Sequence, residues 1–381
     1  MAACSLADAM APYLGTRAQA PWNFAAGPSR LPDAVLARAG EAIFGRGEDG
    51  AAAIERPFTG TVFRDALIGA RQRLTHLLDV PDNYRVLFLA GGAMHQFSAV
   101  PMNLLDPASG LRRIAFADSG YWSQRAMLEA GRYAEVAMIA RHADSMPLAA
   151  PPLDDWQVPT DCAYCHITAN ETVDGIVYPA WPDTGAVPLV ADATSCFLSA
   201  PLDISRFGLI YASAQKNIGP AGMTVVIVRE DLLLRPAHSA PSPFCYRLQA
   251  AQDSCINTPP TLAIHLAGLV FDWIAESGGL TAMAVANRRK AELLYGAIDY
   301  SGGFYTAPVA PGHRSTTNVR FHLADDSLTE RFLLDAEVAG LTHLRGHRHI
   351  GGVRASLYNA MPEAGVAALV DFMTGFMRSH G

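Results

Sequence analysis

The stretch Phe207–Glu230, FGLIYASAQKNIGPAGMTVVIVRE, decides the fold of this chain. Its two apolar, β-branched runs, Leu209–Ala212 and Val225–Val228, flank a turn that contains Lys216 and the sequence Gly-Pro-Ala-Gly. Apolar runs of this length, bounded by Gly and Pro, are typical of buried strands joined by a loop. The pattern predicts that Lys216 lies at a strand end in apolar surroundings.

Lysine is scarce in this sequence. The chain has two lysines, Lys216 and Lys290, among 29 lysines and arginines. Burial lowers the pKa of a lysine by disfavouring the ammonium form, and Schiff-base chemistry requires the neutral amine. The alternative is a surface lysine on a hairpin tip, and the spacing alone leaves both interpretations open.

Composition limits the class of protein. The chain has 381 residues, 50% of them hydrophobic and 17% charged, which is typical of a soluble globular protein of about two domains. Its net charge of −7 argues against a nucleic-acid partner. Residues 1–21 lack the basic and apolar regions of a signal peptide, and no apolar run approaches the roughly 18 residues of a membrane span. We expect a cytoplasmic protein with a mobile N-terminal extension over residues 1–21 and no membrane partner.

One cysteine motif could bind haem or zinc or could be part of a buried strand. Cys162-Ala-Tyr-Cys165-His166 matches the haem-attachment pattern CxxCH and could also be half of a zinc site. No second CxxC or suitably spaced His pair accompanies it, and Ala163–Ile167 has the pattern of a buried strand, in which cysteine is a small hydrophobe. We therefore expect no haem and no metal here, and six cysteines in so long a chain do not indicate a disulfide framework.

Strands and helices alternate through the first two thirds of the chain. Such alternation predicts an α/β fold with a mainly parallel sheet covered by helices on both faces, and ligands in such sheets bind at the carboxyl ends of the strands. The remainder mixes helices with strands such as Thr317–His322 and predicts a smaller α+β domain. We expect a large domain over 34–282 and a small domain formed by 22–33 with 283–381. The expected strands of the large sheet are Val86–Leu89, Ile114–Ala117, Val136–Ile139, Tyr164–Ile167, Leu189–Ala191, Leu209–Ala212 and Val225–Val228.

Four features fall at the predicted strand ends. Gly91-Gly92-Ala93 opens a helix whose free N–H groups could hold a phosphate, although tight packing explains a Gly pair as well. Trp122 could stack on a flat ring or simply fill the core. Asp192 could pair with a protonated ring nitrogen or cap the next turn. Together with Lys216 these are the parts that a pyridoxal-phosphate enzyme needs.

A basic run near the C-terminus indicates the substrate end. Leu344–His349 contains two arginines and two histidines, and arginine binds carboxylates and phosphates bidentately. A basic run is otherwise a solvated face. Arg354, however, lies within the apolar strand Val353–Leu357, where an unpaired charge would be costly, and this favours an anionic partner.

Further segments are spread over nearly the whole chain from Asn23 onward: NFAAGPSRLP, GGAMHQFSAVPMN, DSGYW, NETVDG, VADATS, YASAQKNIGPAGMTVVIVREDLL, NTPPT, KAELLYGAID and GGVRASLYNAMP. With these segments the chain resembles the phosphoserine aminotransferase family. The resemblance implies the fold-type I architecture, with a large domain around a mainly parallel seven-stranded sheet and a smaller C-terminal domain. It also implies a homodimer, pyridoxal phosphate as cofactor, and transfer of the amino group of glutamate to 3-phosphohydroxypyruvate. This reaction serves serine biosynthesis and, in many bacteria, pyridoxine biosynthesis.

The resemblance also assigns roles to matching positions. Lys216 would form the Schiff base, Asp192 would pair with the pyridine nitrogen, and Trp122 would stack on the ring. The remaining cofactor contacts would come from Gly92, Ala93, Met94, Thr172 and Gln215, with Asn257 and Thr258 of the partner subunit reaching the phosphate. Arg354 would bind the substrate α-carboxylate, with His347 and Arg348 at the distal anion.

One departure from the family pattern concerns the substrate. The family carries a His-Arg pair in an early loop, and Phe58 and Thr59 stand at those positions here. Losing a charge-assisted hydrogen bond costs about 1.5–3 kcal/mol. Either Arg56 or another cation compensates, or the chain is a related aminotransferase for a less anionic amino or keto acid. A pyridoxal-phosphate-binding protein without turnover is the non-enzymatic alternative.

Overall fold

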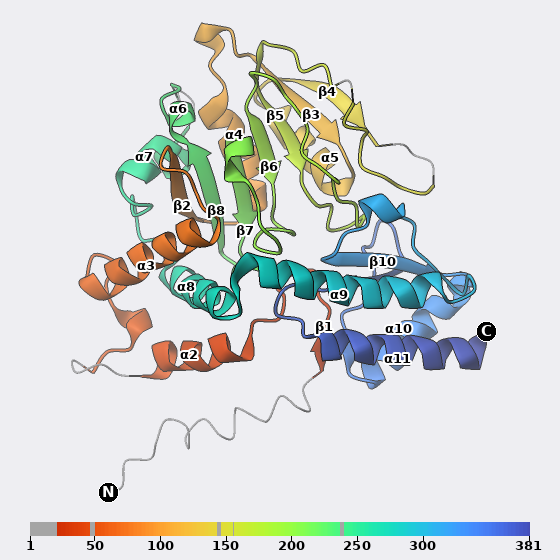
Figure 1. The fold of residues 1–381 in the computed structure, drawn as a ribbon. Coiled ribbons are helices and arrows are strands. Elements are labelled where there is room, and N and C mark those ends of the chain that lie inside the picture. The colour runs from red at the N-terminus through yellow and green to blue at the C-terminus, as the bar shows by residue number, and fades with distance from the viewer. Residues whose placement is uncertain (1–20, 46–49, 143–145, 155, 237–239) are drawn as a thin grey trace, which may run out of the picture.

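The computed structural model describes residues 21–45, 50–142, 146–154, 156–236 and 240–381. Its centre is a seven-stranded sheet with the order β2-β8-β7-β6-β5-β3-β4 (Figure 1). β8 is antiparallel to both of its neighbours, and the strands from β7 to β4 are parallel. The expectation of a mainly parallel sheet is thus confirmed. The strands are β2 (Tyr84–Ala90), β3 (Arg113–Asp118), β4 (Glu135–Arg141), β5 (Cys162–Thr168), β6 (Leu189–Asp192), β7 (Leu209–Ser213) and β8 (Met223–Arg229).

Helices cover both faces of this sheet because successive strand side chains point to opposite faces. In β8, Val225 and Ile227 belong to one core, and Val226 and Val228 belong to another. The first core also holds side chains of α2 (Asp33–Phe44), α3 (Thr61–Leu77) and α8 (Thr261–Glu276). The second holds side chains of α4 (Ala93–Leu104), α5 (Tyr121–Ala130), α6 (Glu230–Leu233) and α7 (Tyr246–Ala251).

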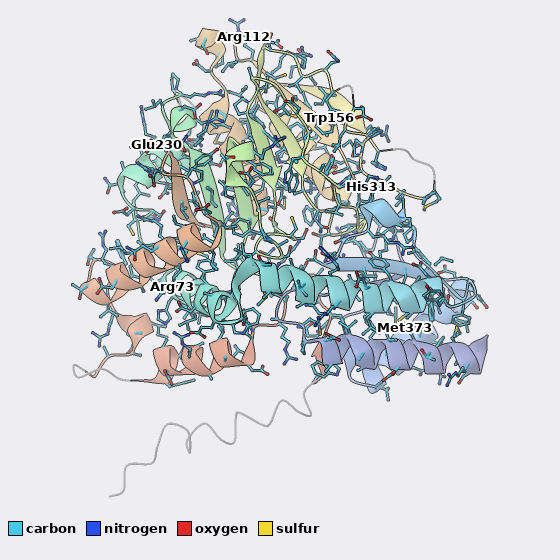
Figure 2. The ribbon with its side chains drawn as sticks, viewed as in Figure 1. Arg73, Arg112, Trp156, Glu230, His313 and Met373 are labelled. Carbon is cyan, nitrogen blue, oxygen red and sulfur yellow. The ribbon has the colours of Figure 1, made fainter. Side chains whose placement is uncertain are left out.

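The C-terminal part forms its own core around two long helices. α9 (Gly279–Asp299) and α11 (Glu363–His380) run side by side in Figure 1. Met373 of α11, labelled in Figure 2, is buried in this core. Phe24 from the N-terminal segment joins the same core. The other elements here are α10 (Thr329–Val338), the sheet β12 (Val353–Ser356)-β10 (Asn318–Leu323)-β9 (Tyr305–Thr306), and the pair β1 (Trp22–Asn23) and β11 (Leu341–Thr342).

Short 3-10 turns complete the described chain: η2 (Ala53–Glu55), η3 (Pro107–Ser109), η4 (Ile204–Arg206), η5 (Ser242–Phe244), η6 (Pro311–His313) and η7 (Asp326–Leu328). The expected N-terminal extension over residues 1–21 lies outside the described residues except for Pro21. The division into domains at 34 and 283 stays a prediction. Among the described residues, no single helix is long and apolar enough to cross a membrane. α8 and α9 pass that test only as a pair, and they are bent by 82° at their junction.

The Lys216 stretch folds as a pair of buried strands, as predicted. β7 pairs antiparallel with β8, and Ser213 and Thr224 are the last partners before the connecting loop. Lys216 lies in that loop with 7% of its surface exposed, so it is not on a solvated hairpin tip. The reason is that the loop lies beneath the C-terminal part, where the side chain of Asn217 accepts a hydrogen bond from the backbone of Asn359.

The CxxCH motif lies in β5, a strand that is buried along its whole length. His166 bonds to the Tyr211 hydroxyl at 2.8 Å and stacks on Phe116 with 4.6 Å between ring centroids. Burial lowers the pKa of His166 to about 3, so the imidazole is a neutral part of the core. The interpretation of this segment as a buried strand is confirmed.

Lys290, the second lysine, ties α9 to the loop that follows β12. Its Nζ donates to the backbone carbonyls of Leu357, Tyr358 and Met361 at 3.0, 2.8 and 2.9 Å. Burial lowers the pKa of Lys290 to about 7. The three carbonyls match the three donors of an ammonium group and so offset the loss of its hydration.

We predict that Lys290→Met lowers the free energy of unfolding by about 2–4 kcal/mol, because three buried carbonyls lose their donor. The urea midpoint measures the change. Arg288→Met, an exposed position on the same helix, is the control and should stay within about 0.5 kcal/mol of the parent. Equal midpoints for the two variants would contradict this role for Lys290.

Candidate active site

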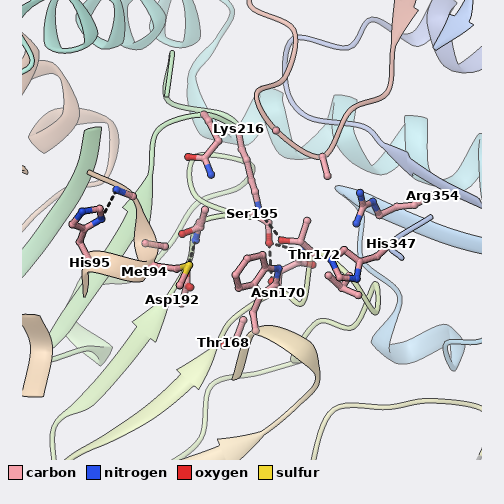
Figure 3. A pocket seen from close by; sticks show the side chains of 18 residues that line it. Met94, His95, Thr168, Asn170, Thr172, Asp192, Ser195, Lys216, His347 and Arg354 are labelled. Carbon is pink, nitrogen blue, oxygen red and sulfur yellow. Dashed lines mark hydrogen bonds between the residues drawn. The ribbon is translucent and has the colours of Figure 1, made fainter. Parts of the chain in front are cut away.

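Five strands of the large sheet end at one edge and surround a cavity of about 500 Å³ (Figure 3). Lys216 follows β7, Asp192 ends β6, Thr172 follows β5, and Trp122 follows β3. The helix α4, which follows β2, adds its N-terminus. Because these strands run in one direction, their carboxyl ends meet at this edge, as the sequence predicts. The predicted residues that line the cavity are Gly92, Ala93, Met94, Trp122, Thr172, Asp192, Gln215, Lys216, His347 and Arg354.

Lys216 brings a buried amine into this cavity. Its Nζ donates to Thr172 Oγ1 at 2.5 Å, and no carboxylate of the described chain lies within ion-pair distance. Burial lowers the pKa of Lys216 to about 8, against the opposing charge of Asp192. A substantial fraction of the amine is therefore neutral near pH 8, which is the nucleophilic form.

Asp192 is 5% exposed and faces the same cavity. Its Oδ1 accepts from the backbone N–H of Thr194 at 2.9 Å, so the Asx-type cap exists. The carboxylate lines the cavity, so it can also accept from a donor on a ligand. Burial raises the pKa of Asp192, and the Thr194 hydrogen bonds and the Lys216 charge oppose this.

The N-terminus of α4 can hold an anion. The backbone N–H groups of Ala93 and Met94 have no acceptor among the described residues, and they open a helix of 12 residues. The preceding loop needs its glycine, because Gly91 has φ +101° and a Cβ there would lie 2.7 Å from the His95 ring. The side chain of Gln215 also lines this side of the cavity.

Trp122 is the second residue of α5 and is half-buried against the cavity. Its indole Nε1 is buried and has no partner in the described chain. A side chain that only filled the core would leave this donor unsatisfied. The geometry therefore favours contact with a ligand over simple core filling.

Arg354 and His347 form the other wall of the cavity. Arg354 is largely buried, its Nε has no partner, and no carboxylate of the described chain pairs with it. Burial lowers the pKa of Arg354 and also that of His347, which in addition faces the Arg354 charge. An unpaired buried guanidinium of this kind favours an anionic ligand. Arg348 is exposed and does not line the cavity.

Two predicted groups of residues lie away from this cavity. Asn257 and Thr258 are exposed and line a separate hollow of about 210 Å³ beside His95. Phe58 packs against the large core, and Thr59 is exposed. Arg56 lies by α3 and α8, where its guanidinium donates to the Ala51 carbonyl at 3.4 Å.

The structure adds cavity residues that the sequence reasoning missed. Asn170 and Ser195 are buried and hydrogen-bonded to each other at 2.7 Å, and Thr194 lies beside them. Asn170 follows β5, and Thr194 and Ser195 follow β6, and this position after two strand ends is the signal that could have found them. Gly27 is a further addition, because a Cβ on it would lie 3.0 Å from Gln215 Cγ.

These observations fit pyridoxal phosphate in four independent respects. The N–H groups of α4 lack acceptors in the described chain where a phosphate would bind, and the Asp192 carboxylate lines the cavity, where it can accept from a ring N–H. The Trp122 side chain lines the same cavity and can lie against a flat ring. The fourth respect is the buried amine of Lys216.

Comparison with known proteins agrees with this geometry. The model of the family "Aminotransferase class-V" matches residues 21–369. A phosphoserine aminotransferase from Acidithiobacillus ferrooxidans is 48% identical over 364 residues, which span 94% of this chain and 99% of that protein. Another, from Bordetella avium, is 46% identical over 375 residues, or 95% and 99% of the two chains.

Solved structures give the same result. Phosphoserine aminotransferase from Bacillus circulans subsp. alkalophilus superposes with a TM-score of 0.91 at 42% identity, over 95% of this chain and 99% of that one. The PLP-bound enzyme from Trichomonas vaginalis gives a TM-score of 0.88 at 37% identity, over 93% and 99%. This chain therefore belongs to the phosphoserine aminotransferase family of pyridoxal-phosphate-dependent class-V aminotransferases.

Proposed function

We propose that this cavity transfers the amino group of glutamate to 3-phosphohydroxypyruvate, giving phosphoserine and 2-oxoglutarate for serine biosynthesis. The observation that carries the proposal is the pairing of an amine and a guanidinium in one cavity. The Lys216 amine is buried without an ion pair, and Arg354 lies opposite with its charge equally unpaired. A nucleophile that faces an anion-binding group suits an amino acid as substrate.

We assign the cofactor contacts to groups that line the cavity and can donate or accept a hydrogen bond there. The N–H groups of Ala93 and Met94, with Gln215, would bind the phosphate. Trp122 would lie on the ring face, Asp192 Oδ2 would accept from the ring nitrogen, and Thr172 would bond beside Lys216. When bound, pyridoxal phosphate supplies the electron sink for the negative charge that develops at the substrate α-carbon.

Lys216 would act as the base of the reaction. Its Nζ would take the proton from the substrate α-carbon, and the pKa near 8 suits proton transfer at neutral to mildly alkaline pH. Thr172 Oγ1, at 2.5 Å, accepts a hydrogen bond from this amine and so orients it. Because Lys216 is only 7% exposed, bulk water has little access to the amine and competes little for the proton.

The substrate anions are assigned to the opposite wall. Arg354 would bind the α-carboxylate, and His347 would meet the distal carboxylate or phosphate with Arg348 beside it. Phe58 and Thr59 supply no charge, so binding of the distal anion depends on other groups. A less anionic substrate is thus the alternative outcome of the experiment below.

We also propose that the active form is a homodimer. Asn257 and Thr258 are exposed beside the helix α4 that would hold the phosphate, which suits a contribution to a second copy of the site. Large apolar side chains of α4 and α7 are also exposed: Met94 is 51% and Leu248 is 38% exposed. The five cysteines of the described residues carry free thiols, which is consistent with a reducing, cytoplasmic compartment.

The amino donor and acceptor can be tested in single half-reactions. We predict that the loaded protein loses its visible absorbance rapidly with phosphoserine and with glutamate, and at least tenfold more slowly with alanine, which lacks a distal anion. Stopped-flow absorbance measures each rate. Fast conversion by glutamate and another amino acid, with phosphoserine silent, would instead support the alternative substrate.

The role of Lys216 predicts a pH dependence of cofactor uptake. The amine reacts when neutral, so the rate at which the apoprotein takes up pyridoxal phosphate should rise with pH and level off above about 8. Growth of visible absorbance between pH 6 and pH 10 measures this rate, and Lys216→Ala should show no such growth. A rate that still climbs at pH 10 would point to an ordinary, solvated lysine.

A shared site predicts complementation between two defective chains. Lys216→Ala lacks the base, and Asn257→Asp places a negative charge against the phosphate, so each alone should keep less than about 10% of the activity. Refolding them together should restore about a quarter of the parent activity, because mixed dimers contain one intact site. Activity no higher than the average of the two variants would mean that Asn257 serves its own chain.

A further inference from the structure

The first turn of α5 is held by carboxylates from a distant loop. Asp174 Oδ2 accepts from the backbone N–H of Tyr121 at 2.9 Å. Glu171 Oε2 accepts from the N–H of Trp122, and Oε1 accepts from the N–H of Ser123, each at 2.8 Å. The first three N–H groups of a helix have no partner within the helix, and here all three are satisfied from the loop after β5.

This arrangement replaces an ordinary N-cap. The residue before the helix is Gly120, which has no side chain that could cap it, and its φ is +151°. A Cβ on Gly120 would lie 2.5 Å from Asp174 Oδ2 and 3.1 Å from Glu171 Cδ. The close approach of the two carboxylates therefore requires glycine at this position.

The same loop also contacts the reactive amine. Thr172, directly after Glu171, accepts from Lys216 Nζ at 2.5 Å. Trp122, whose backbone Glu171 holds, lines the cavity with an unpartnered indole donor. The adjacent residues Glu171 and Thr172 thus contact the two groups that would meet the cofactor, the first through the backbone of Trp122 and the second at the amine of Lys216.

We propose that Glu171 is a positioning residue. It fixes the position of the Trp122 ring over the cofactor relative to the Lys216 amine. The proposal rests on the proposed function of the cavity and concerns the holding of the cofactor, not the choice of amino donor. Glu171 itself is fully buried and does not line the cavity, so it acts through Trp122 and not on the substrate.

A carboxyl group is needed because each of its oxygens accepts a different backbone N–H. A glutamine of the same shape has one accepting oxygen, and its NH₂ group would face the remaining N–H. One buried donor would lose its acceptor, and the first turn of α5 would have to shift. Asp174 accepts a single N–H, so an asparagine there can keep that bond.

The test compares Glu171→Gln with Asp174→Asn and with Glu129→Gln, a partly exposed position at the other end of α5. The apoprotein of each variant is titrated with pyridoxal phosphate, and the circular dichroism of the bound cofactor is recorded in its visible band. We expect Glu171→Gln to weaken cofactor binding about tenfold and to reduce the visible dichroism, and both comparison variants to stay within about twofold.

A double-mutant cycle separates positioning from general stability. In a Trp122→Ala background no ring is left to position, so Glu171→Gln should then change cofactor affinity by less than about twofold. An unchanged tenfold effect in that background, or unchanged dichroism in Glu171→Gln alone, would overturn the proposal. If Glu171→Gln does not fold, Asp174→Ala supplies the same cycle, with an expected loss of about threefold that disappears without Trp122. None of these measurements uses an amino donor. If the proposed substrate proved wrong, the cofactor affinities and the dichroism would therefore still test the role of Glu171.

Discussion

The desolvation of the Lys216 amine is the constraint on which the rest of the site depends. A cation is expensive to bury, and this one has no ion pair among the described residues. The Thr172 hydroxyl accepts a hydrogen bond from the amine. The Asp192 carboxylate, which lies beyond ion-pair distance, opposes the lowering of the Lys216 pKa. The cavity therefore keeps its charges separated, and the amine stays close to the balance between its two protonation states. A nearer carboxylate would stabilise the ammonium form and remove the nucleophile.

The two halves of the chain are joined by amides that set the distance from the amine to the anion-binding wall. Asn217, next to Lys216, accepts from the backbone of Asn359, which follows the strand that carries Arg354. On the other side of the cavity, the Asn170 amide donates to Asn318 at 2.9 Å, in the strand paired with that of Arg354. Buried amide contacts of this kind are directional, so they specify one relative position of the two halves more sharply than apolar packing would.

Much of this fold follows from local patterns, and much of the site does not. The β-branched runs around Lys216 predict their strands correctly because buried strands repeat every two residues, and Asp192 is found at a strand end for the same reason. The contact of Glu171 with Trp122 joins residues 49 apart in the sequence, and no local pattern encodes it. Likewise, Asn257 resembles a cofactor ligand in sequence but lies outside the cavity of its own chain. Sequence similarity identifies which residues match those of a family. It does not say which subunit supplies a residue to a site, because that depends on how the chains assemble.

The burial of both lysines has a consequence for the chemistry of the cofactor itself. Pyridoxal phosphate is an aldehyde, and free aldehydes condense with any accessible primary amine. Here Lys216 is 7% exposed at the base of the cavity, and Lys290 is 2% exposed with its three donors already engaged. All other residues among the 29 lysines and arginines of the sequence are arginines, which stay protonated and do not compete. The cofactor thus meets one productive side-chain amine, Lys216, and hardly any unproductive ones. Its selective reaction with Lys216 therefore depends on the amino-acid composition as well as on the shape of the pocket.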